Sequence, residues 1–507
     1  MASNHVVEIE RKFDVEESAV LPSLQDLPGV DRIDKPVERR LEAEYFDTRD
    51  LRLASSRITL RRRKGGEDAG WHLKLPSAAD ERREFREPLG KEDEGVPEPL
   101  LRLVRVHTRG RVLVPVARLT TRRIVHHLLS KKGKVLASVS DDTVEAETLA
   151  PKHALQRWRE WEVELVEGSR DMLDGGQDRL TNAGAQPSAH PSKLERALGT
   201  GPQTFTNSGT PEPNPKPNST AGDVLLAYLS AQVQELKAQD PRVRLDAPDA
   251  VHKMRVATRR MRSALSTYKK LLDHADYVNS LRDELKWLAG VLGQARDAEV
   301  MHARLKDMVA EEPSELVMGP VTRRIDLELG ADYQKAHAKV LKTLDGQRYF
   351  RLLDSLETIL TGPPRSQLAK KRARTVIPRL VKRDVQRLRE AVREAKRNPA
   401  GTSDHPALHE ARKDGKRLRY AAEAAMSISP KKAARLADGA QGVQKILGDH
   451  QDSVVTRELL RRLGAEAFVQ GENGFSYGRL HALEQAAAVD AEARFHRQWK
   501  KFPAASL

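Results

Sequence analysis

The period of the hydrophobic pattern changes once along the chain. From residue 6 to about residue 168, short segments alternate apolar and polar side chains with the period of two that is typical of β-strands. From residue 222 onward the period is near 3.6, which is typical of helices. Residues 199–222 are rich in Pro, Gly, Asn and Thr and cannot bury a core. We therefore expect an α+β multidomain protein with a strand-rich domain (1–200), a flexible linker (201–221) and an all-α domain (222–507).

The strand-rich domain is expected to consist mainly of antiparallel strands joined by turns. After a first strand near residues 7–13, one helix is expected at 16–24. Gly65-Gly66 predicts a hairpin between two of the following strands. These strands are expected at 38–48, 57–64, 71–76, 82–88, 112–127, 135–142 and 156–167.

Charged side chains recur at a period of two along these strands. The first and last strands carry mainly carboxylates, whereas the middle strands carry Lys and Arg. An open sheet with its charged face in water and a closed barrel with a charged lumen both show this alternation. The segregation of acids from bases favours the barrel, because such a lumen could hold metal ions on one side and phosphates on the other. The residues are Glu8, Glu10, Lys12, Arg61, Arg63, Lys74, Arg82, Glu160, Glu162 and Glu164.

Five short motifs follow one another in this domain. They are EIERK at residues 8–12, YFDT at 45–48, LRRR at 60–63, WHLKLP at 71–76 and WEVEL at 161–165. The first fits the ExExK signature of the CYTH family, the triphosphate tunnel metalloenzymes, and the set resembles that family in its order. The resemblance implies an antiparallel β-barrel, or tunnel, of about eight strands with flanking helices.

The resemblance also implies roles for individual residues. Asp141 is preferred to Asp142, and Arg123 to Arg122, on the spacing of the motifs. Glu8, Glu10 and Lys12 would be catalytic. Mg or Mn would be bound by Glu8, Glu10, Asp141, Glu162 and Glu164. Triphosphate would be bound by Lys12, Arg61, Arg63, Lys74, Arg82, Arg118, Arg123 and Lys193.

Members of the family hydrolyse triphosphates, including thiamine triphosphate, or act as adenylate cyclases. We expect a divalent-metal-dependent triphosphatase, a phosphoanhydride hydrolase acting on inorganic triphosphate, in which a water attacks in line with help from metal ions and a basic wall. The alternatives are a non-catalytic polyphosphate-binding protein, hydrolysis of a nucleoside or thiamine triphosphate, and a class IV-type adenylate cyclase. The sequence has no Walker-type loop, so a P-loop mechanism is unsupported.

An internal repeat organises the helical half. Residues 252–262 recur as residues 409–419, and in both copies a histidine is followed by bases at its third, seventh and tenth positions. A Leu-Gly pair follows each copy at a similar interval, at residues 292–293 and 447–448, and we expect one helix to end and another to begin near each pair. The pattern predicts a duplicated helical bundle with repeats at about 222–365 and 366–507.

The bases of both copies stack on one face of a helix, where like charges repel. A solvated basic face and a polyanion groove are both compatible with this pattern, and the repetition behind a histidine favours the groove. The repeat resembles the CHAD family, conserved-histidine α-helical domains associated with polyphosphate binding. We expect each histidine to donate a hydrogen bond to phosphate. The resemblance implies polyphosphate binding by His252, Arg255, Arg259, Arg260, Arg262, His409, Arg412, Lys416, Arg417 and Arg419.

The composition limits the partners. A formal charge of +15 indicates a polyanion, and we expect inorganic triphosphate and inorganic polyphosphate. With 4% aromatic residues and no helix-turn-helix, RNA-recognition or zinc motif, the sequence argues against nucleic acid. The absence of cysteine excludes thiolate metal sites. No apolar run approaches the roughly 20 residues that span a membrane, so we expect a cytoplasmic protein, with association with polyphosphate granules as a further hypothesis.

Overall fold

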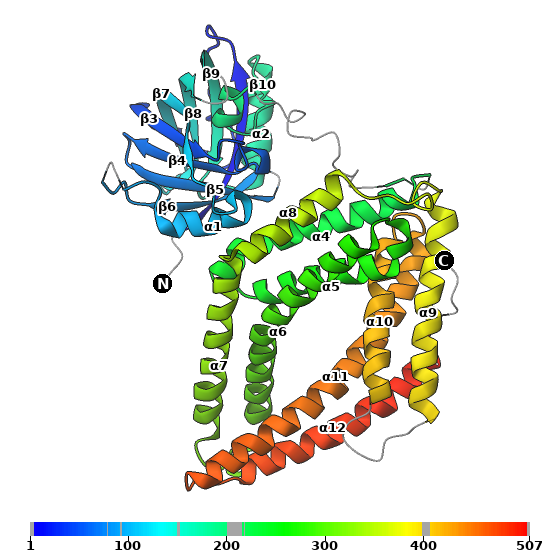
Figure 1. Cartoon of the computed structure of the whole chain (residues 1–507). Coiled ribbons are helices and arrows are strands. Elements are labelled where there is room, and N and C mark those ends of the chain that lie inside the picture. The colour runs from blue at the N-terminus through cyan, green and yellow to red at the C-terminus, as the bar shows by residue number, and fades with distance from the viewer. Residues whose placement is uncertain are drawn as a thin grey trace. The chain divides into compact units, whose positions relative to one another are not determined.

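The computed structural model divides into two compact units, Met1–Asn207 and Ser208–Leu507 (Figure 1). It describes residues 5–78, 80–91, 94–149, 153–199, 215–216, 218–397 and 406–503. Most of the predicted linker, residues 201–214 and 217, lies outside the described residues. The first unit is built from strands and the second from helices, as the change of hydrophobic period predicts.

A closed antiparallel β-barrel forms the first unit. Eight strands follow the order β1-β6-β5-β4-β3-β7-β8-β9, and β9 pairs back to β1. The short strands β2 (Arg32–Ile33) and β10 (Gln186–Pro187) add to β7 and β1. The predicted barrel of about eight strands is thus confirmed. Its strands are β1 (His5–Val15), β3 (Val37–Asp47), β4 (Thr59–Lys64), β5 (Gly70–Ala78), β6 (Glu81–Glu87), β7 (Val114–Leu129), β8 (Val135–Thr148) and β9 (Ala154–Leu165).

The register of the strands directs the charged faces into the lumen. Glu8 lies opposite Arg82 across β1 and β6, and Lys12 lies opposite Glu162 across β1 and β9. Residues that are directly opposite point to the same side of a sheet. Because the sheet closes, the open-sheet alternative is wrong, and the charged faces line an interior.

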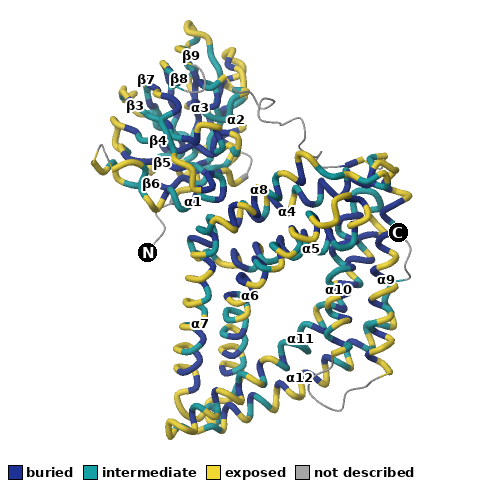
Figure 2. Tube along the Cα trace, in the orientation of Figure 1, coloured by how far each residue is buried: buried dark blue, intermediate teal, exposed yellow. Residues whose placement is uncertain are grey.

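Two apolar clusters hold the barrel and its flanking helices together. On the outer surface, side chains of β1, β8 and β9 pack under α2 (Arg170–Asn182), with Trp161 and Leu173 fully buried. Inside one end, Leu194 and Ala197 of α3 (Lys193–Ala197) pack against residues that include Trp158. The helix α3 therefore closes that end of the lumen with apolar side chains. Figure 2 shows the buried stretches of the strands.

Two local predictions in this unit differ from the structure. The helix expected at 16–24 is wrong: these residues form turns and a loop, and Leu24 joins the outer apolar cluster under α2. Pro22 explains the difference, because its ring and missing N–H oppose a continuous helix. Conversely, α1 (Glu98–Thr108) was not expected from the sequence.

The second unit is helical, and its helices repeat in length. The pairs α4 and α9 have 24 and 25 residues, α5 and α10 have 18 and 19, α6 and α11 have 37 and 40, and α7 and α12 have 24 and 25. Only α8 has no counterpart among the described residues. The helices are α4 (Ala221–Arg244), α5 (Ala250–Thr267), α6 (Ala275–Glu311), α7 (Val321–Leu344), α8 (Gln347–Thr361), α9 (Ala373–Arg397), α10 (Pro406–Ala424), α11 (Pro430–Val469) and α12 (Phe475–Trp499).

The expected helix ends at the Leu-Gly pairs are wrong. Both α6 and α11 run through them without interruption. The glycines provide room for a neighbouring helix: a Cβ atom at Gly293 would lie 3.4 Å from Nε of Arg255, and one at Gly448 would lie 3.8 Å from Nη2 of Arg412. None of the described helices combines the length and the apolar composition that crossing a membrane requires.

Candidate functional site

A buried cluster of carboxylates lies on one wall of the barrel lumen. Ligand oxygens of Asp142, Glu160 and Glu162 lie within 4.8 Å of one another. Lys193 of α3 reaches into this cluster, with Nζ at 2.8 Å from Oδ2 of Asp142, 2.7 Å from Oε1 of Glu160 and 2.6 Å from Oε1 of Glu162. Burial alone would lower the pKa of Lys193, but these carboxylates raise it well above the usual range. The helix that closes the barrel thus carries a cation to its acidic wall.

Lys12 and Arg123 neutralise the same wall from two other strands. Nζ of Lys12 lies 2.9 Å from Oε2 of Glu10 and also forms an ion pair with Glu162. Arg123 forms two hydrogen bonds with Asp142, at 2.8 and 2.6 Å, and a third with Glu162 at 2.5 Å. Burial opposes ionisation of Glu10, but Lys12 and Lys74 outweigh it and lower the pKa of Glu10 to about 2. These acids are charged at neutral pH.

Glu164 is the lumen carboxylate whose negative charge is least balanced by nearby cations. Burial, and then the charge of Glu8, raises the pKa of Glu164 to about 7, although Lys74 acts in the opposite direction. Lys74 also forms an ion pair with Glu8. Glu8, Glu10 and Glu164 therefore concentrate negative charge at the junction of β1 and β9.

Bases line the opposite wall. Arg61 and Arg63 alternate along β4, and Nη1 of Arg61 donates a hydrogen bond of 3.4 Å to the hydroxyl of Tyr45. Burial and the charges of Arg61 and Arg123 lower the pKa of Arg63 to about 9, and Arg63 forms an ion pair with Asp68. Such mutually repelling guanidinium groups would gain from a bound polyanion.

Space is available beside the charged side chains at the edge of the lumen. A cavity of about 660 Å³ is lined by Glu10, Lys12 and Arg82 and bounded by residues 187–191. Arg82 donates a hydrogen bond to the carbonyl oxygen of Pro191 at its edge. A charged ligand in this cavity could contact Glu10, Lys12 and Arg82.

Two of the predicted lumen residues lie elsewhere. Asp141 points away from the lumen and forms two hydrogen bonds with Arg159, at 2.8 and 2.6 Å, while its neighbour Asp142 faces inward. Arg118 is exposed on the outer surface, 3.0 Å from Glu44. The choice of Arg123 over Arg122 agrees with the structure, because Arg122 pairs outside with Glu38. The other predicted tunnel residues line the lumen or its edge: Glu8, Glu10, Lys12, Arg61, Arg63, Lys74, Arg82, Glu162, Glu164 and Lys193.

Two acids of the lumen, Glu160 and Glu84, were assigned no metal or substrate role from the sequence. Glu160 belongs to the carboxylate cluster and accepts a hydrogen bond of 2.6 Å from Nε1 of Trp158. Glu84 is fully buried, lies 2.8 Å from Nδ1 of His72 and forms an ion pair with Arg86. Strand parity puts both on the charged face, because they lie two residues from Glu162 and Arg82, but the motifs of the family gave neither of them a role.

The donors of the acidic wall fit a divalent metal. All are carboxylate oxygens, which Mg and Mn accept readily. Lys12, Lys193 and Arg123 already neutralise part of the wall, whereas the raised pKa of Glu164 reflects its burial and then the negative charge of Glu8, which a cation would balance. Glu8, Glu10, Asp142, Glu160, Glu162 and Glu164 would form the set from which ligands are drawn.

In the helical unit, the two histidine helices α5 and α10 pack against each other and bring their bases together. We call Arg255, Arg259, Arg412 and Lys416 the inner basic surface. Burial, and then Arg259 and Arg412, lowers the pKa of Lys416 to about 6. Arg259 and Lys416 form no ion pair within the part of the chain that the structure describes. The arginines of the surface are thus only partly balanced by Asp297 and Asp452, and burial together with their positive charge disfavours a proton on Lys416.

Each repeat positions one arginine of this surface in the same way. Arg255 lies over Gly293 and 3.4 Å from Asp297, and Arg412 lies over Gly448 and 3.8 Å from Asp452. In both cases the aspartate follows the glycine by one helical turn, on the same face of the long helix. In each repeat, the glycine of the Leu-Gly motif thus provides the space that the arginine side chain occupies.

The remaining predicted polyphosphate residues have varied surroundings. His252 lies where burial and Arg296 lower its pKa, and Nδ1 of His409 lies 2.8 Å from Oε1 of Gln451. Burial and Arg259 lower the pKa of Arg262, which extends the positive region along α5. By contrast, three arginines are paired with acids: Arg260 and Arg419 with Glu423, at 3.1 and 2.9 Å, and Arg417 with Asp414, at 3.6 Å.

The lowered pKa of Lys416 predicts that this lysine reduces the stability of the folded protein near neutral pH. Between pH 6 and the ordinary value of 10.5, Lys416 keeps its proton in the unfolded chain but loses it in the folded chain. The free energy of unfolding therefore rises with pH across this range and is reduced near pH 7. We expect Lys416→Met to raise the free energy of unfolding by about 1 kcal/mol at pH 7 and by less at pH 9.5. Denaturant unfolding at both values measures this, with Lys413→Met on the exposed face of α10 as the control. An equal gain at both pH values would contradict the assignment.

Fold and sites together define a protein in which an ion-lined barrel precedes a duplicated helical domain with a basic surface. The model of the CYTH domain matches residues 7–196, and the model of the CHAD domain matches residues 227–461. The chain is 39% identical over 495 residues to the uncharacterized protein MT2285 of Mycobacterium tuberculosis, covering 94% of this chain and 93% of that protein. The chain therefore belongs to the family of proteins that join a CYTH domain to a CHAD domain.

Two solved structures resemble parts of the chain. The CHAD domain from the plant Ricinus communis is 21% identical with a TM-score of 0.47, covering 59% of this chain and 98% of that chain. HpAC1 from Hippeastrum, reported to have a dominant triphosphatase activity, is 16% identical with a TM-score of 0.25, covering 39% and 98%.

Proposed function

We propose that the barrel hydrolyses inorganic triphosphate with Mg or Mn, and that the helical domain binds inorganic polyphosphate and so localises the enzyme. The observation that carries the proposal is the lumen itself. Six carboxylates line one side of it and Arg61 and Arg63 line another, while Lys12, Lys74, Arg123 and Lys193 pair with individual carboxylates. A metal-bound triphosphate has the matching distribution of charge, because the cations sit on one side of the phosphate oxygens.

The residues of the two walls have separate tasks in this reaction. Arg61, Arg63 and Lys74 would hold the phosphoryl oxygens and stabilise charge that develops on them. Lys12 lies between the walls and would exchange its bond to Glu162 for a phosphate oxygen. A divalent metal held by the carboxylates would supply Lewis-acid polarisation of the bound phosphates. The apolar end formed by α3 would keep bulk water away from the phosphates.

Phosphate release by the purified full-length protein tests this function. Inorganic triphosphate, ATP and long-chain polyphosphate are offered separately, first with Mg and then with Mn. Fast release from triphosphate that disappears with a chelator supports the proposal. Release from ATP alone would indicate a nucleoside triphosphatase, and cyclic AMP formation would indicate a cyclase. No turnover of any of them, with tight polyphosphate binding, would indicate a binding protein without catalysis.

The two adjacent aspartates of β8 provide a matched pair of variants. We expect Asp142→Asn to slow triphosphate hydrolysis by about 100-fold, because it removes a lumen carboxylate that aligns Arg123 and Lys193. Asp141→Asn loses an ion pair with Arg159 outside the lumen and should change the rate less than threefold, a small effect on the scale of surface pairs. Initial rates at saturating metal measure both. The opposite order would mean that Asp141 is the functional residue.

A further inference from the structure

The helix α9 and the residues just before it form a strongly basic segment outside the histidine helices. Residues 370–397 contain 12 basic and 3 acidic residues, in a chain whose formal charge is +15. The first of the acids, Asp384, is buried and accepts a hydrogen bond of 2.6 Å from the hydroxyl of Thr267. The exposed part of this segment therefore carries a high positive charge that neighbouring acids do not cancel.

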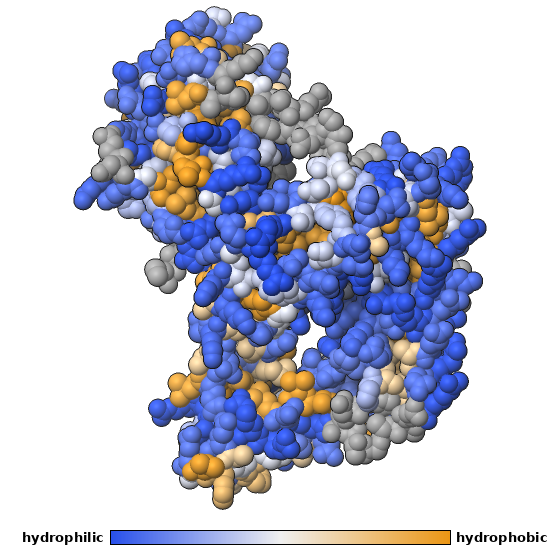
Figure 3. Space-filling model, in the orientation of Figure 1, coloured by the Kyte–Doolittle hydropathy of each residue, from blue (hydrophilic) through white to orange (hydrophobic). Residues whose placement is uncertain are grey.

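The bases of α9 point outward. Its apolar residues, which include Ile377, Val381 and Leu388, are buried where α9 packs on α10 and α4. Within this fully described segment, every exposed residue is polar or charged. Figure 2 shows exposed and buried positions alternating along α9, and Figure 3 shows hydrophilic residues along the edge of the helical unit that α9 forms.

Most of the bases of α9 have no acidic partner among the described residues. Arg379, Lys382, Arg383 and Arg393 are exposed and form no ion pair or side-chain hydrogen bond with any residue that the structure describes. Like charges at such spacings cost a few tenths of a kcal/mol per pair in a helix. These four residues span about 21 Å along the helix axis, at 1.5 Å per residue. We call these four residues the outer basic face.

We propose that the outer basic face binds a second segment of the same long polyphosphate chain that occupies the inner basic surface. This inference rests on the proposed function of the helical domain. The helix α10 packs against α5 and against α9. A single helix, α10, lies between α5 and α9 and is about 10 Å thick. A chain that leaves the inner basic surface therefore needs few additional phosphates to reach α9.

The composition of the face supports a bare polyphosphate chain over other polyanions. A membrane-binding helix would expose apolar side chains beside its bases, and a face for single-stranded nucleic acid would expose aromatic rings. The exposed residues of 370–397 include neither. Binding of one segment would also raise the effective concentration of the next segment at α9. The contribution of α9 should therefore appear only with chains long enough to reach it.

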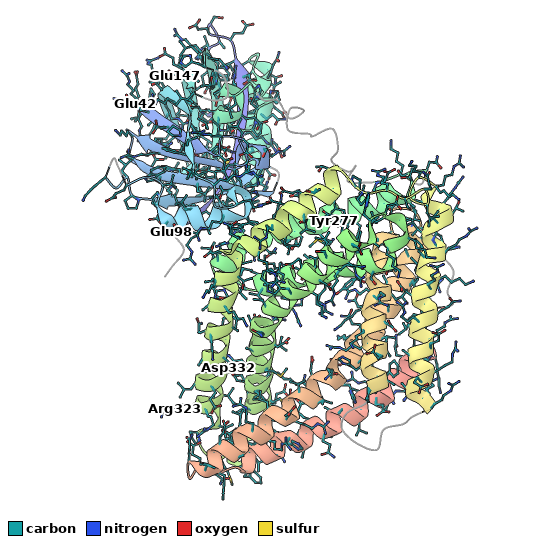
Figure 4. The ribbon with its side chains drawn as sticks, viewed as in Figure 1. Glu42, Glu98, Glu147, Tyr277, Arg323 and Asp332 are labelled. Atoms are coloured by element: carbon teal, nitrogen blue, oxygen red, sulfur yellow. The ribbon has the colours of Figure 1, made fainter. Side chains whose placement is uncertain are left out.

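The test compares two quadruple variants of the full-length protein. The first is Arg379→Gln, Lys382→Gln, Arg383→Gln and Arg393→Gln. The control removes the same charge from the opposite side of the helical unit, with Arg323→Gln, Lys335→Gln, Lys342→Gln and Arg461→Gln. Arg323 is labelled on α7 in Figure 4, and α7 and α9 form opposite edges of the unit in Figure 1. Gln keeps the helix propensity of the exposed positions.

Dissociation constants are measured for polyphosphate of about ten and about one hundred phosphates at several salt concentrations. We expect the α9 variant to bind the long chain about tenfold more weakly, with a shallower dependence on salt, and to bind the short chain normally. Normal short-chain binding also shows that the variant is folded. The control variant should bind both chains as the wild type does.

Three outcomes would overturn the inference. Unchanged long-chain binding would remove α9 as a contact, and equal weakening in both variants would reduce the effect to net charge. Loss of duplex DNA binding in the α9 variant, with long-chain polyphosphate binding retained, would assign the face to nucleic acid. Failure of the wild type to bind either chain would instead refute the proposed function of the helical domain.

Discussion

Glu8→Gln combined with Glu10→Gln will lower the rate of phosphate release from triphosphate by about 1000-fold or more. Both carboxylates lie in the lumen at the junction of β1 with β6 and β9. Gln keeps their size but provides only neutral oxygens, which bind a divalent cation much more weakly. The change also leaves Lys12 and Lys74 without two of the acids that they contact. Initial rates over a range of metal concentrations measure the loss.

The control for this variant is the same change on the other face of the barrel. Glu42 and Glu44 are also two residues apart on one strand, and both lie on the outside, where Glu44 pairs with Arg118. Figure 4 labels Glu42. Replacing both with Gln should leave the rate within twofold, since surface ion pairs contribute little. Retained activity in the first variant, with its circular dichroism unchanged, would remove Glu8 and Glu10 from the metal site.

Arg255→Glu combined with Arg412→Glu will weaken polyphosphate binding by about 100-fold or more and leave triphosphate hydrolysis unchanged. The two arginines occupy equivalent positions against Gly293 and Gly448. Each substitution removes a positive charge and adds a negative one beside Arg259 and Lys416, so the field of the inner basic surface is reversed at its centre. Titration of labelled long-chain polyphosphate at fixed salt measures the affinity.

Lys253→Glu with Lys413→Glu is the matched control for charge, because both lysines are exposed on the same two helices. We expect at most a fewfold effect, through the total charge alone. If this control weakens binding as much as the arginine pair does, the inner basic surface is not the binding site. If the arginine pair also slows hydrolysis of triphosphate, the two domains do not act separately.

The sequence by itself determined which faces carry charge. A period of two places Glu8, Glu10 and Lys12 on one side of a strand whatever the strand pairs with, and a period of 3.6 does the same for Arg255 and Arg259 on a helix. The change of period also separated a strand-rich part of the chain from a helical part. These features were predictable because they depend on local geometry, which each segment carries with it.

The alternation of side chains along a strand also indicates which residues can share a face, and matching to the motifs of the family did not use this information. Arg118 and Arg123 are five residues apart on β7, so a regular strand cannot direct both into the lumen. The structure places Arg123 inside and Arg118 outside. The choice between Asp141 and Asp142 was different, because it depended on the register of β8 against β9, and no local pattern specifies that register.

Only the tertiary structure decided how the charged faces meet. Closure of the barrel brought the β1 carboxylates to the carboxylates of β9, about 150 residues away, and packing of α3 carried Lys193 into their midst. Packing of α5 on α10 likewise lowered the pKa of Lys416. Gly293 lies within a continuous helix, where it leaves space for Arg255, and does not end the helix. The physical reason is that these pKa values and contacts arise from burial and from charges on distant segments, which exist only once the chain has folded.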